Sequence, residues 1–260
     1  MKTPITYFGG KQKLADTIIA LLPKGKLFVE PFIGGGAVFF SLEPYSSEII
    51  NDLDSTISIF YRVLKDDFKS LKKKIDGTLY CRATHKVALC IRNQKHLFSD
   101  VHIAWSFFCL SALGFSGTLE SFGCYTKGAK AKTFENKKKL FTPELAKRLE
   151  GVQIENTDAL RLIKLRDTPD TVFYLDPPYI DTAQASYRGY TEEMYTQLLD
   201  LLSNLKGHFL LSSFPTNVLD KYIKDYGWFS KEIVQVKSAS RNKDGTKKMK
   251  IEVLTANYPI

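Results

Sequence analysis

The stretch "FYLDPPYID", residues 173–181, places an acid, two prolines and a tyrosine directly after strand-like residues. Proline fixes its own φ angle and has no N–H group, so Pro177 and Pro178 hold the neighbouring carbonyls in place. The Asp176 carboxylate and the Pro177 carbonyl are adjacent acceptors, which suit an amino group with two N–H donors. Tyr179 adds a flat ring for stacking, worth about 1–3 kcal/mol per base in single-stranded recognition. These residue types indicate a site for the exocyclic amine of a nucleobase.

A glycine-rich turn upstream indicates a second part of a binding site. Residues 31–36 read "PFIGGG" and follow a strand-like stretch, and Asp52 ends the next such stretch. Glycines let the backbone approach a ligand closely, and an acidic side chain can accept hydrogen bonds from both hydroxyls of a ribose. A dinucleotide site requires G-x-G-x-x-G, but after Gly34 and Gly36 the third position is Phe39. The sequence therefore disfavours a pyrophosphate site, and a plain strand-to-helix turn explains the glycines equally well when they are taken alone.

The elements that must position these residues follow an α/β order. A strand, a glycine turn, a helix and a second strand occupy residues 27–51. A helix is predicted over 191–205, with Thr191 as its N-cap and Met194 on its apolar face. Further strands are predicted at 152–156, 171–175, 208–214, 231–236 and 250–258, the last two forming a hairpin.

The carboxyl ends of these strands are the expected ligand edge, as in other open α/β sheets. We therefore expect residues 31–36, Asp52, Asp158 and residues 176–179 to converge there. Asp158 has an alternative role, because it also stands where the N-cap of a following helix is expected.

A helical segment interrupts the α/β pattern between residues 55 and 150. Its apolar residues keep helical spacing without alternating strands, which predicts an inserted, mostly helical domain. The Gly, Ser and Lys-rich residues 114–139 are predicted to form a long loop. The predicted domains are thus residues 1–54 with 151–260, and residues 55–150.

Composition narrows the function classes. The 260 residues carry a formal charge of +9, much of it in lysine-rich runs beside loop-forming residues, which favours a polyanionic partner without choosing between DNA and RNA. The four cysteines are irregularly spaced without a C-x-x-C pair, so neither a zinc site nor a disulfide framework is indicated. No apolar run is long enough to span a membrane, and the polar N-terminus is unlike a signal peptide. We therefore expect a cytoplasmic protein without a membrane partner.

Four motifs together resemble the DNA adenine-N6 methyltransferases of the Dam (D12) class. They are "YFGGK" (7–11), "FVEPFIGGG" (28–36), "NDLD" (51–54) and "YLDPPY" (174–179), and the tail "GTKKMKIEVLTANY" (245–258) is also similar to that family. The resemblance implies a Rossmann-like S-adenosylmethionine-dependent methyltransferase sheet with an inserted helical DNA-recognition domain. It also implies transfer of a methyl group from S-adenosylmethionine to the N6 amino group of adenine in double-stranded DNA. The base is expected to be flipped out of the duplex, because it cannot otherwise reach such a pocket.

Roles for individual residues follow from their positions in these motifs. Asp176 and the Pro177 carbonyl would draw the amine hydrogens out of the base plane and make its nitrogen nucleophilic, without a metal ion. The resemblance implies catalytic roles for Asp176, Pro177, Pro178 and Tyr179. It implies cofactor contacts for Tyr7, Lys11, Phe32, Gly34, Gly36, Asp52, Asp158 and Asp176. Contacts with DNA are expected from Arg188, Arg241, Lys247 and Lys248.

Alternative functions remain compatible with the residues. An N4-cytosine DNA methyltransferase or an RNA adenine methyltransferase would also act on an exocyclic amine. A non-enzymatic nucleic-acid-binding module would explain the charge but not residues 176–179. The target sequence is not identified, because the segment "SALGFSGTLESFGCYTKG" (111–128) departs from the "N…G.FN.PFG"-like stretch of GATC-type members. We expect a monomer when free, in a bacterial or phage-infected cell.

Overall fold

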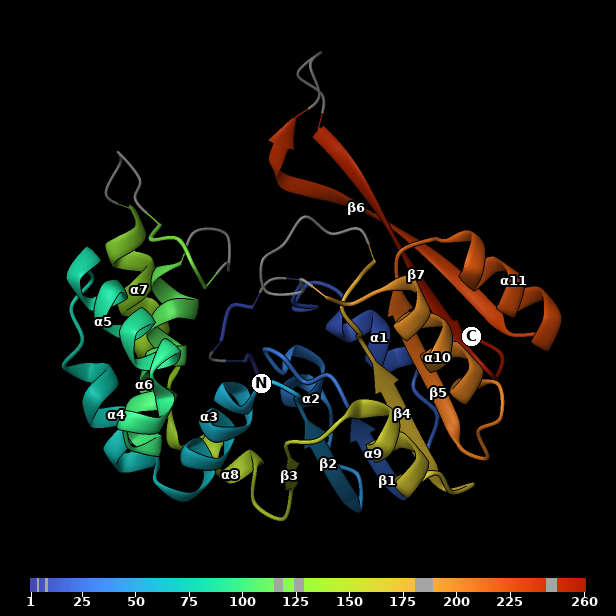
Figure 1. Ribbon diagram of the computed structural model, residues 1–260, viewed down its shortest axis with the longest axis horizontal. Coiled ribbons are helices and arrows are strands. Elements are labelled where there is room, and N and C mark those ends of the chain that lie inside the picture. The colour runs from blue at the N-terminus through green and yellow to red at the C-terminus, as the bar shows by residue number, and fades with distance from the viewer. Residues whose placement is uncertain (4, 8, 115–118, 124–128, 181–188, 242–246) are drawn as a thin grey trace. The chain divides into compact units, whose positions relative to one another are not determined.

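The structure is a computed structural model that describes all residues except 4, 8, 115–118, 124–128, 181–188 and 242–246 (Figure 1). It also does not describe the side chains of residues 129–130, 235–241 and 247–248. Two compact units are present, Met1–Ile19 with Ile33–Asp158, and Ala20–Phe32 with Ala159–Ile260. Helix α1 (Ala15–Leu21) begins in the first unit and ends in the second. Within the described residues, seven strands form the sheet and helices connect them, which confirms the predicted α/β class.

The second unit contains five strands in the order β1-β4-β5-β7-β6. Strands β1, β4 and β5 are parallel, whereas β7 is antiparallel to both β5 and β6, which confirms the predicted closing hairpin. Helices α9, α10 and α11 lie along these strands (Figure 1). The bounds are β1 (Leu27–Glu30), α9 (Ala159–Arg166), β4 (Thr171–Leu175), α10 (Glu192–Leu202), β5 (His208–Ser213), α11 (Asn217–Tyr226), β6 (Phe229–Arg241) and β7 (Lys247–Ala256).

Strand β4 is the interior strand of this unit that leads into the "DPPY" motif. All five of its residues, "TVFYL", are buried, as expected for a parallel strand covered on both faces. Helix α10 follows, and the Thr191 hydroxyl accepts a hydrogen bond from the Met194 N–H at 3.2 Å, which confirms the predicted N-cap. The predicted apolar face was wrong at Met194, whose exposed fraction is 42%, because the helix buries Tyr195 instead.

The first unit contains two parallel strands and most of the helices. Strands β2 and β3 pair with Ile49 opposite Gln153. The bounds are α2 (Ala37–Ser41), β2 (Ser47–Asn51), α3 (Ser55–Asp66), α4 (Phe68–Asp76), α5 (Arg82–Asn93), the 3₁₀ helix η1 (Lys95–Leu97), α6 (Asp100–Leu113), α7 (Ala129–Leu140), α8 (Pro143–Arg148) and β3 (Gln153–Glu155).

Helix α6 is the centre of the helical segment. It is apolar on all sides, as expected for a helix surrounded by protein, and it packs against α3, α4 and α5. Phe107 lies edge-on to Phe60 of α3 with ring centroids 5.3 Å apart, and Phe108 lies edge-on to Phe141 at 5.7 Å. The described residues between 55 and 150 therefore form a helical core, while the predicted domain boundaries stay a prediction.

The predicted loop over 114–139 was wrong in its second half. Residues 129–140 form helix α7, although their lysines make the helix polar on most of its surface. Phe134 of α7 is almost fully buried, with its ring centroid 6.2 Å from that of Phe108. A single buried aromatic side chain therefore anchors a helix that hydrophobic periodicity does not reveal.

Helix α8 is attached to the β2 region through one buried ion pair. The Arg148 guanidinium donates to the Glu48 carboxylate at 2.8 Å and to the Phe39 carbonyl at 3.1 Å. It also lies over the Phe39 ring, 3.9 Å from the centroid. The pair therefore connects the end of the helical segment to a strand of the sheet. None of the helices in the described part of the chain is long and apolar enough to cross a membrane.

Candidate active site

The glycine turn of residues 33–36 is held against the end of β2. The Ile33 N–H donates to the Asn51 carbonyl at 2.9 Å, and the Gly36 N–H donates to the Ile33 carbonyl at 2.7 Å. The buried Tyr61 hydroxyl donates to the Gly34 carbonyl at 2.9 Å. Gly34 and Gly36 have φ angles of +46° and +66°, a region that other L-residues adopt at a steric cost. The turn is therefore a fixed backbone surface and not a loose connection.

Tyr7 packs directly on this turn. A Cβ atom at Gly34 would lie 3.1 Å from the Tyr7 ring, and one at Gly35 would lie 2.8 Å from the Tyr7 Cβ. The preceding residue, Thr6, exchanges hydrogen bonds with the Ser111 hydroxyl of α6 at 2.9 and 3.0 Å. Nearby, Lys11 is 5% exposed and donates to the Gly9 carbonyl at 3.1 Å. The structure thus brings Tyr7 to the glycine turn, as the resemblance implies.

Asp52, the residue after β2, is fixed by two backbone donors. Its Oδ2 accepts from the Gly34 N–H and its Oδ1 accepts from the Asp54 N–H, both at 3.0 Å. Burial raises the pKa of Asp52 to about 7, although these two donors lower it, and the Asp54 charge raises it further. Each carboxylate oxygen retains acceptor capacity beyond one hydrogen bond. The side chain can therefore accept hydrogen bonds from a diol, and it does so best when it is ionised.

Asp158 lies near the same strand end. It is exposed and follows β3, and the residue before it is bound by the Asn51 side chain. The Thr157 N–H donates to Asn51 Oδ1 at 2.9 Å, and Asn51 Nδ2 donates to the Thr157 carbonyl at 3.1 Å. The Asn156 amide donates to the Asp52 carbonyl at 2.7 Å. Asp52 and the segment that carries Asp158 are therefore held together within the first unit.

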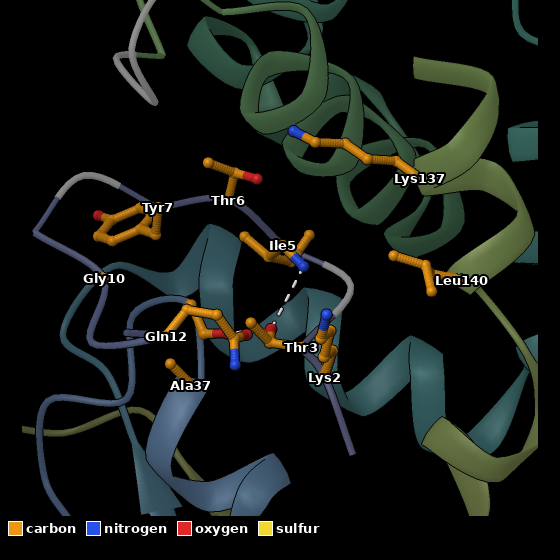
Figure 2. Close-up of a pocket in the computed structure, with 11 residues that line it drawn as sticks. Lys2, Thr3, Ile5, Thr6, Tyr7, Gly10, Gln12, Ala37, Lys137 and Leu140 are labelled. Carbon is orange, nitrogen blue, oxygen red and sulfur yellow. Dashed lines mark hydrogen bonds between the residues drawn. The ribbon is translucent and has the colours of Figure 1, made fainter. Parts of the chain in front are cut away.

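A pocket adjoins the glycine turn in the first unit (Figure 2). In Figure 2 the N-terminal segment with Tyr7 forms one wall, and Lys137 and Leu140 of α7 reach it from another. Tyr7 is the predicted cofactor residue that lines it. The full lining is Lys2, Thr3, Ile5, Thr6, Tyr7, Gly10, Gln12, Gly35, Ala37, Lys137 and Leu140.

The "DPPY" motif lies in the second unit, where the strand order passes from β1 to β4. In doubly wound sheets the ligand crevice lies at such a switch point, outside the carboxyl ends of the strands. Val29 pairs with Phe173, so Phe32 and Asp176, each three residues further on, stand at the same level beyond the two strands. Asp176 is partly exposed, and the Tyr179 hydroxyl donates to its Oδ1 at 3.0 Å. The carboxylate is therefore oriented by a residue of its own motif.

The Tyr179 side chain has further neighbours just after β5 and on β7. Its ring centroid is 4.4 Å from that of Phe214, with the planes 54° apart. The Lys250 ammonium lies 5.3 Å from the Tyr179 centroid and 4.7 Å from the Phe214 centroid. The Tyr179 hydroxyl also lies within hydrogen-bonding distance of Glu252 Oε1, a second possible acceptor of its hydrogen. Tyr179 is thus fixed at both its ring and its hydroxyl.

Two acids of this region, Glu30 and Glu252, were missed by the sequence reasoning, as was Phe214. Glu30 is 2% exposed and Glu252 fully buried. Burial raises the pKa of the Tyr174 hydroxyl well above its ordinary value, and the charges of Asp176, Glu30 and Glu252 raise it further. The sequence did contain a signal for the two glutamates, because "LFVE" and "IEVL" each place one acid among apolar, strand-forming residues.

The predicted DNA contacts lie outside what the structure describes. Arg188 is in the segment 181–188, and the side chains of Arg241, Lys247 and Lys248 are likewise not described. These four assignments stay predictions. Among the described residues, no group of three or more His, Cys, Asp or Glu could hold a metal ion.

Comparison with known proteins shows the family. The sequence model of the D12 class N6 adenine-specific DNA methyltransferases matches residues 7–235. The chain belongs to this family. This confirms the predicted adenine-N6 DNA methyltransferase, in preference to the cytosine, RNA and non-enzymatic alternatives.

Curated relatives of this D12 methyltransferase have related names. The type II methyltransferase M1.LlaDCHI of Lactococcus lactis subsp. cremoris is 28% identical over 97% of this chain and 94% of the relative. The DNA adenine methylase of Escherichia coli K12 is 26% identical over 98% of this chain and 94% of the relative. The DNA N-6-adenine-methyltransferase of Escherichia phage P1 is 33% identical over 43% of this chain, but only 15% of that longer protein is matched.

The predicted site residues of this methyltransferase fall into two groups. The first unit brings together Tyr7, Gly34 and Asp52, a backbone turn with a ring and a carboxylate suited to a nucleoside. The second unit brings together Asp176 and Tyr179 at the carboxyl end of β4, an oriented acceptor suited to an amino group.

Proposed function

We propose that this D12 methyltransferase uses S-adenosylmethionine as its methyl donor and that the predicted cofactor residues bind it. The turn at Gly34 supports this, because the Tyr7 ring packs against its bare backbone, where a Cβ atom would lie 3.1 Å from the ring. Asp52 supports it as well, since its fixed carboxylate can accept both ribose hydroxyls. In this proposal Lys11, Gly36 and Phe32 complete the contacts, and Asp158 meets the adenine of the cofactor.

The charge of the site fits a cationic ligand. When bound, S-adenosylmethionine supplies a methyl group activated on a positively charged sulfur. Near the end of β4, the charges of Asp176, Glu30 and Glu252 add to the effect of burial in raising the pKa of the Tyr174 hydroxyl, and Lys250 pairs with one of these three acids, Glu252, which leaves an excess of negative charge around this hydroxyl in the proposal. A positive ligand is stabilised in such a field, whereas an anionic ligand such as a pyrophosphate is disfavoured.

Asp176 is the group that activates the acceptor amine. The amino nitrogen of adenine is a weak nucleophile, because its lone pair is delocalised into the ring. Asp176, held by Tyr179, accepts one N–H hydrogen bond, and the Pro177 carbonyl accepts the other, while Pro178 stiffens the segment. The observation that carries this role is the 3.0 Å hydrogen bond that orients Asp176 at the β1/β4 switch point. The Tyr179 ring then supplies a stacking surface for the extruded base.

Double-stranded DNA is the proposed form of the substrate, with the target adenine flipped out. The net charge of +9 supports contacts with phosphates, for which we retain Arg188, Arg241, Lys247 and Lys248, and residues 55–150 are the proposed recognition domain. Binding should therefore weaken steeply with salt. We propose that the free protein is a monomer. Sequencing the DNA of cells that express the protein, with modified adenines identified base by base, would reveal the target sequence.

Asp176→Ala tests the catalytic proposal. Turnover on DNA should fall by about 10²–10³, the range for losing one preorganised hydrogen-bond partner of a transition state. Cofactor binding, measured by calorimetry, should remain largely intact. Asp170→Ala is the matched control, since Asp170 precedes the same strand and pairs with Lys26 at the surface. Turnover of Asp176→Ala within a few-fold of the control would refute the assigned role.

A further inference from the structure

The Tyr179 hydroxyl lies between two carboxylates that cannot both receive its hydrogen. It is within hydrogen-bonding distance of Asp176 Oδ1 and of Glu252 Oε1. Burial, followed by the charges of Asp176 and Glu252, raises the pKa of Tyr179 well above its ordinary value. The hydroxyl therefore keeps its single hydrogen and donates it to one of the two acids at a time.

Glu252 is the second possible acceptor for the Tyr179 hydroxyl, and its neighbours fix its position. It is fully buried on β7, its Oε1 also accepts from the Ser212 hydroxyl at 2.6 Å, and its Oε2 is 3.0 Å from the Lys250 ammonium. A hydroxyl donor and a cation both favour the ionised form of a carboxylate. Both contacts favour a negative Glu252 beside Tyr179, which places a negative charge next to the residue that orients Asp176.

We propose that Glu252 and Lys250 are positioning residues for Asp176, acting through Tyr179, and that the Tyr179 hydrogen moves from Asp176 to Glu252 during methyl transfer. The inference rests on the proposed role of Asp176. In the transfer, the adenine nitrogen forms a bond to the methyl carbon, and the electron pair of the carbon–sulfur bond stays on sulfur. One N–H proton passes to Asp176. The neutralised carboxyl is then the weaker acceptor, so the Tyr179 hydrogen turns to Glu252.

Two opposite charges on β7 thus tune the proton affinity of Asp176. The negative charge of Glu252 favours protonation of Asp176, whereas the positive charge of Lys250 opposes it. Without Glu252, the Tyr179 hydrogen would remain on Asp176 and make that carboxylate a poorer proton acceptor. Lys250 on β7 and Tyr179 after β4 contact Glu252 directly, and the charges of Glu252 and Asp176 act on both Tyr179 and Tyr174, with Glu30 of β1 acting on Tyr174 as well.

The test is the pH dependence of kcat in Glu252→Gln and Lys250→Met, at saturating DNA and cofactor. Activity is lost as the pH falls, because Asp176 must be ionised to accept the amine hydrogens. Glu252→Gln should move this acid limb to lower pH by about one unit, the size expected for removing a neighbouring like charge. Lys250→Met should move it to higher pH. Opposite shifts are expected only if both charges act on the group that titrates.

Controls separate this inference from other causes. Glu232→Gln removes an exposed acid from the same hairpin, where Glu232 pairs with Val253, and should leave the acid limb in place. Tyr179→Phe should reduce the shift caused by Glu252→Gln by at least half. An unmoved acid limb in Glu252→Gln, with only a lower Tm, would assign Glu252 a structural role and overturn the inference. If Glu252→Gln does not fold, an unmoved limb in Lys250→Met overturns it equally. Failure of the wild-type protein to methylate DNA would instead overturn the proposed function.

Discussion

Asp52 should make cofactor binding depend on pH near neutrality. Its carboxyl accepts hydrogen bonds from the Gly34 and Asp54 N–H groups, yet burial raises its pKa to about 7 in the ligand-free protein. Ribose hydroxyls donate hydrogen bonds, so they favour the ionised carboxylate over the neutral acid. The proposed cofactor therefore binds best to protein in which Asp52 is ionised. The ionised fraction falls as the pH is lowered through 7.

The magnitude follows from the pKa. One unit below the pKa, about one carboxyl in eleven is ionised, so the Kd should be about tenfold higher than its limiting value at high pH. Each further unit should cost another factor of about ten, or roughly 1.4 kcal/mol. The stability of the free protein changes in the opposite sense. The folded pKa of about 7 lies above the ordinary value of 3.8, so this group destabilises the free protein increasingly as the pH rises from about 4 to 7.

Isothermal titration calorimetry with S-adenosylhomocysteine between pH 6 and pH 8 measures the effect. This product analogue carries the same ribose but no sulfonium charge, so it isolates the diol contact. Asp52→Asn is the control, because its amide does not titrate, and any proton equilibrium of the ligand itself persists in that variant. A wild-type Kd that is constant across this range, or an equal pH slope in Asp52→Asn, would refute the reasoning.

Two further predictions concern stability. Gly36→Ala should lower the free energy of unfolding by about 1–2 kcal/mol because its φ angle is positive. The new Cβ atom would also lie 2.8 Å from a buried tyrosine hydroxyl, and this contact should lower the free energy of unfolding further. Gly151 has a similar φ angle, but a Cβ atom there would meet no other atom, so Gly151→Ala should lower the free energy of unfolding by less. Thermal denaturation measures both variants, and equal losses of stability would contradict the contact argument. Arg148→Met should cost about 3–5 kcal/mol, because it leaves Glu48 buried without its partner. Arg62→Met, in an exposed pair, should cost at most about 1 kcal/mol, and similar Tm values for the two variants would show that burial is unimportant here.

The strands that position the site could be predicted closely from the sequence. The predicted strand at 171–175 has the same bounds as β4, because five buried residues, four of them apolar, end at an acid and two prolines. The position of Asp176 at the carboxyl end of a parallel strand follows from that pattern alone. The turn at Gly34 was also foreseen, since glycine there matches a positive φ angle.

The surroundings of Asp176 could not be predicted in the same way. Glu252 follows Asp176 by more than seventy residues, and only the strand order β4-β5-β7 brings it to the Tyr179 hydroxyl. Hydrophobic patterning finds strands by their apolar residues and passes over a single acid among them. Lys250 and Glu252 are two residues apart, which places both on one face of β7, and that spacing was the available signal.

The acids in the interior of the protein have two kinds of surroundings, and this difference indicates function. Glu48 is matched by Arg148, which places one cation against one carboxylate and joins two elements. Around the Tyr174 hydroxyl, by contrast, burial raises the pKa and the charges of three acids, Asp176, Glu30 and Glu252, raise it further, although Lys250 lies 3.0 Å from Glu252. Placing like charges around one buried hydroxyl lowers stability, so packing alone gives no reason for the arrangement. The proposed reaction, which begins with a cationic donor and releases a proton, does give a reason, because nearby acids stabilise both positive charges.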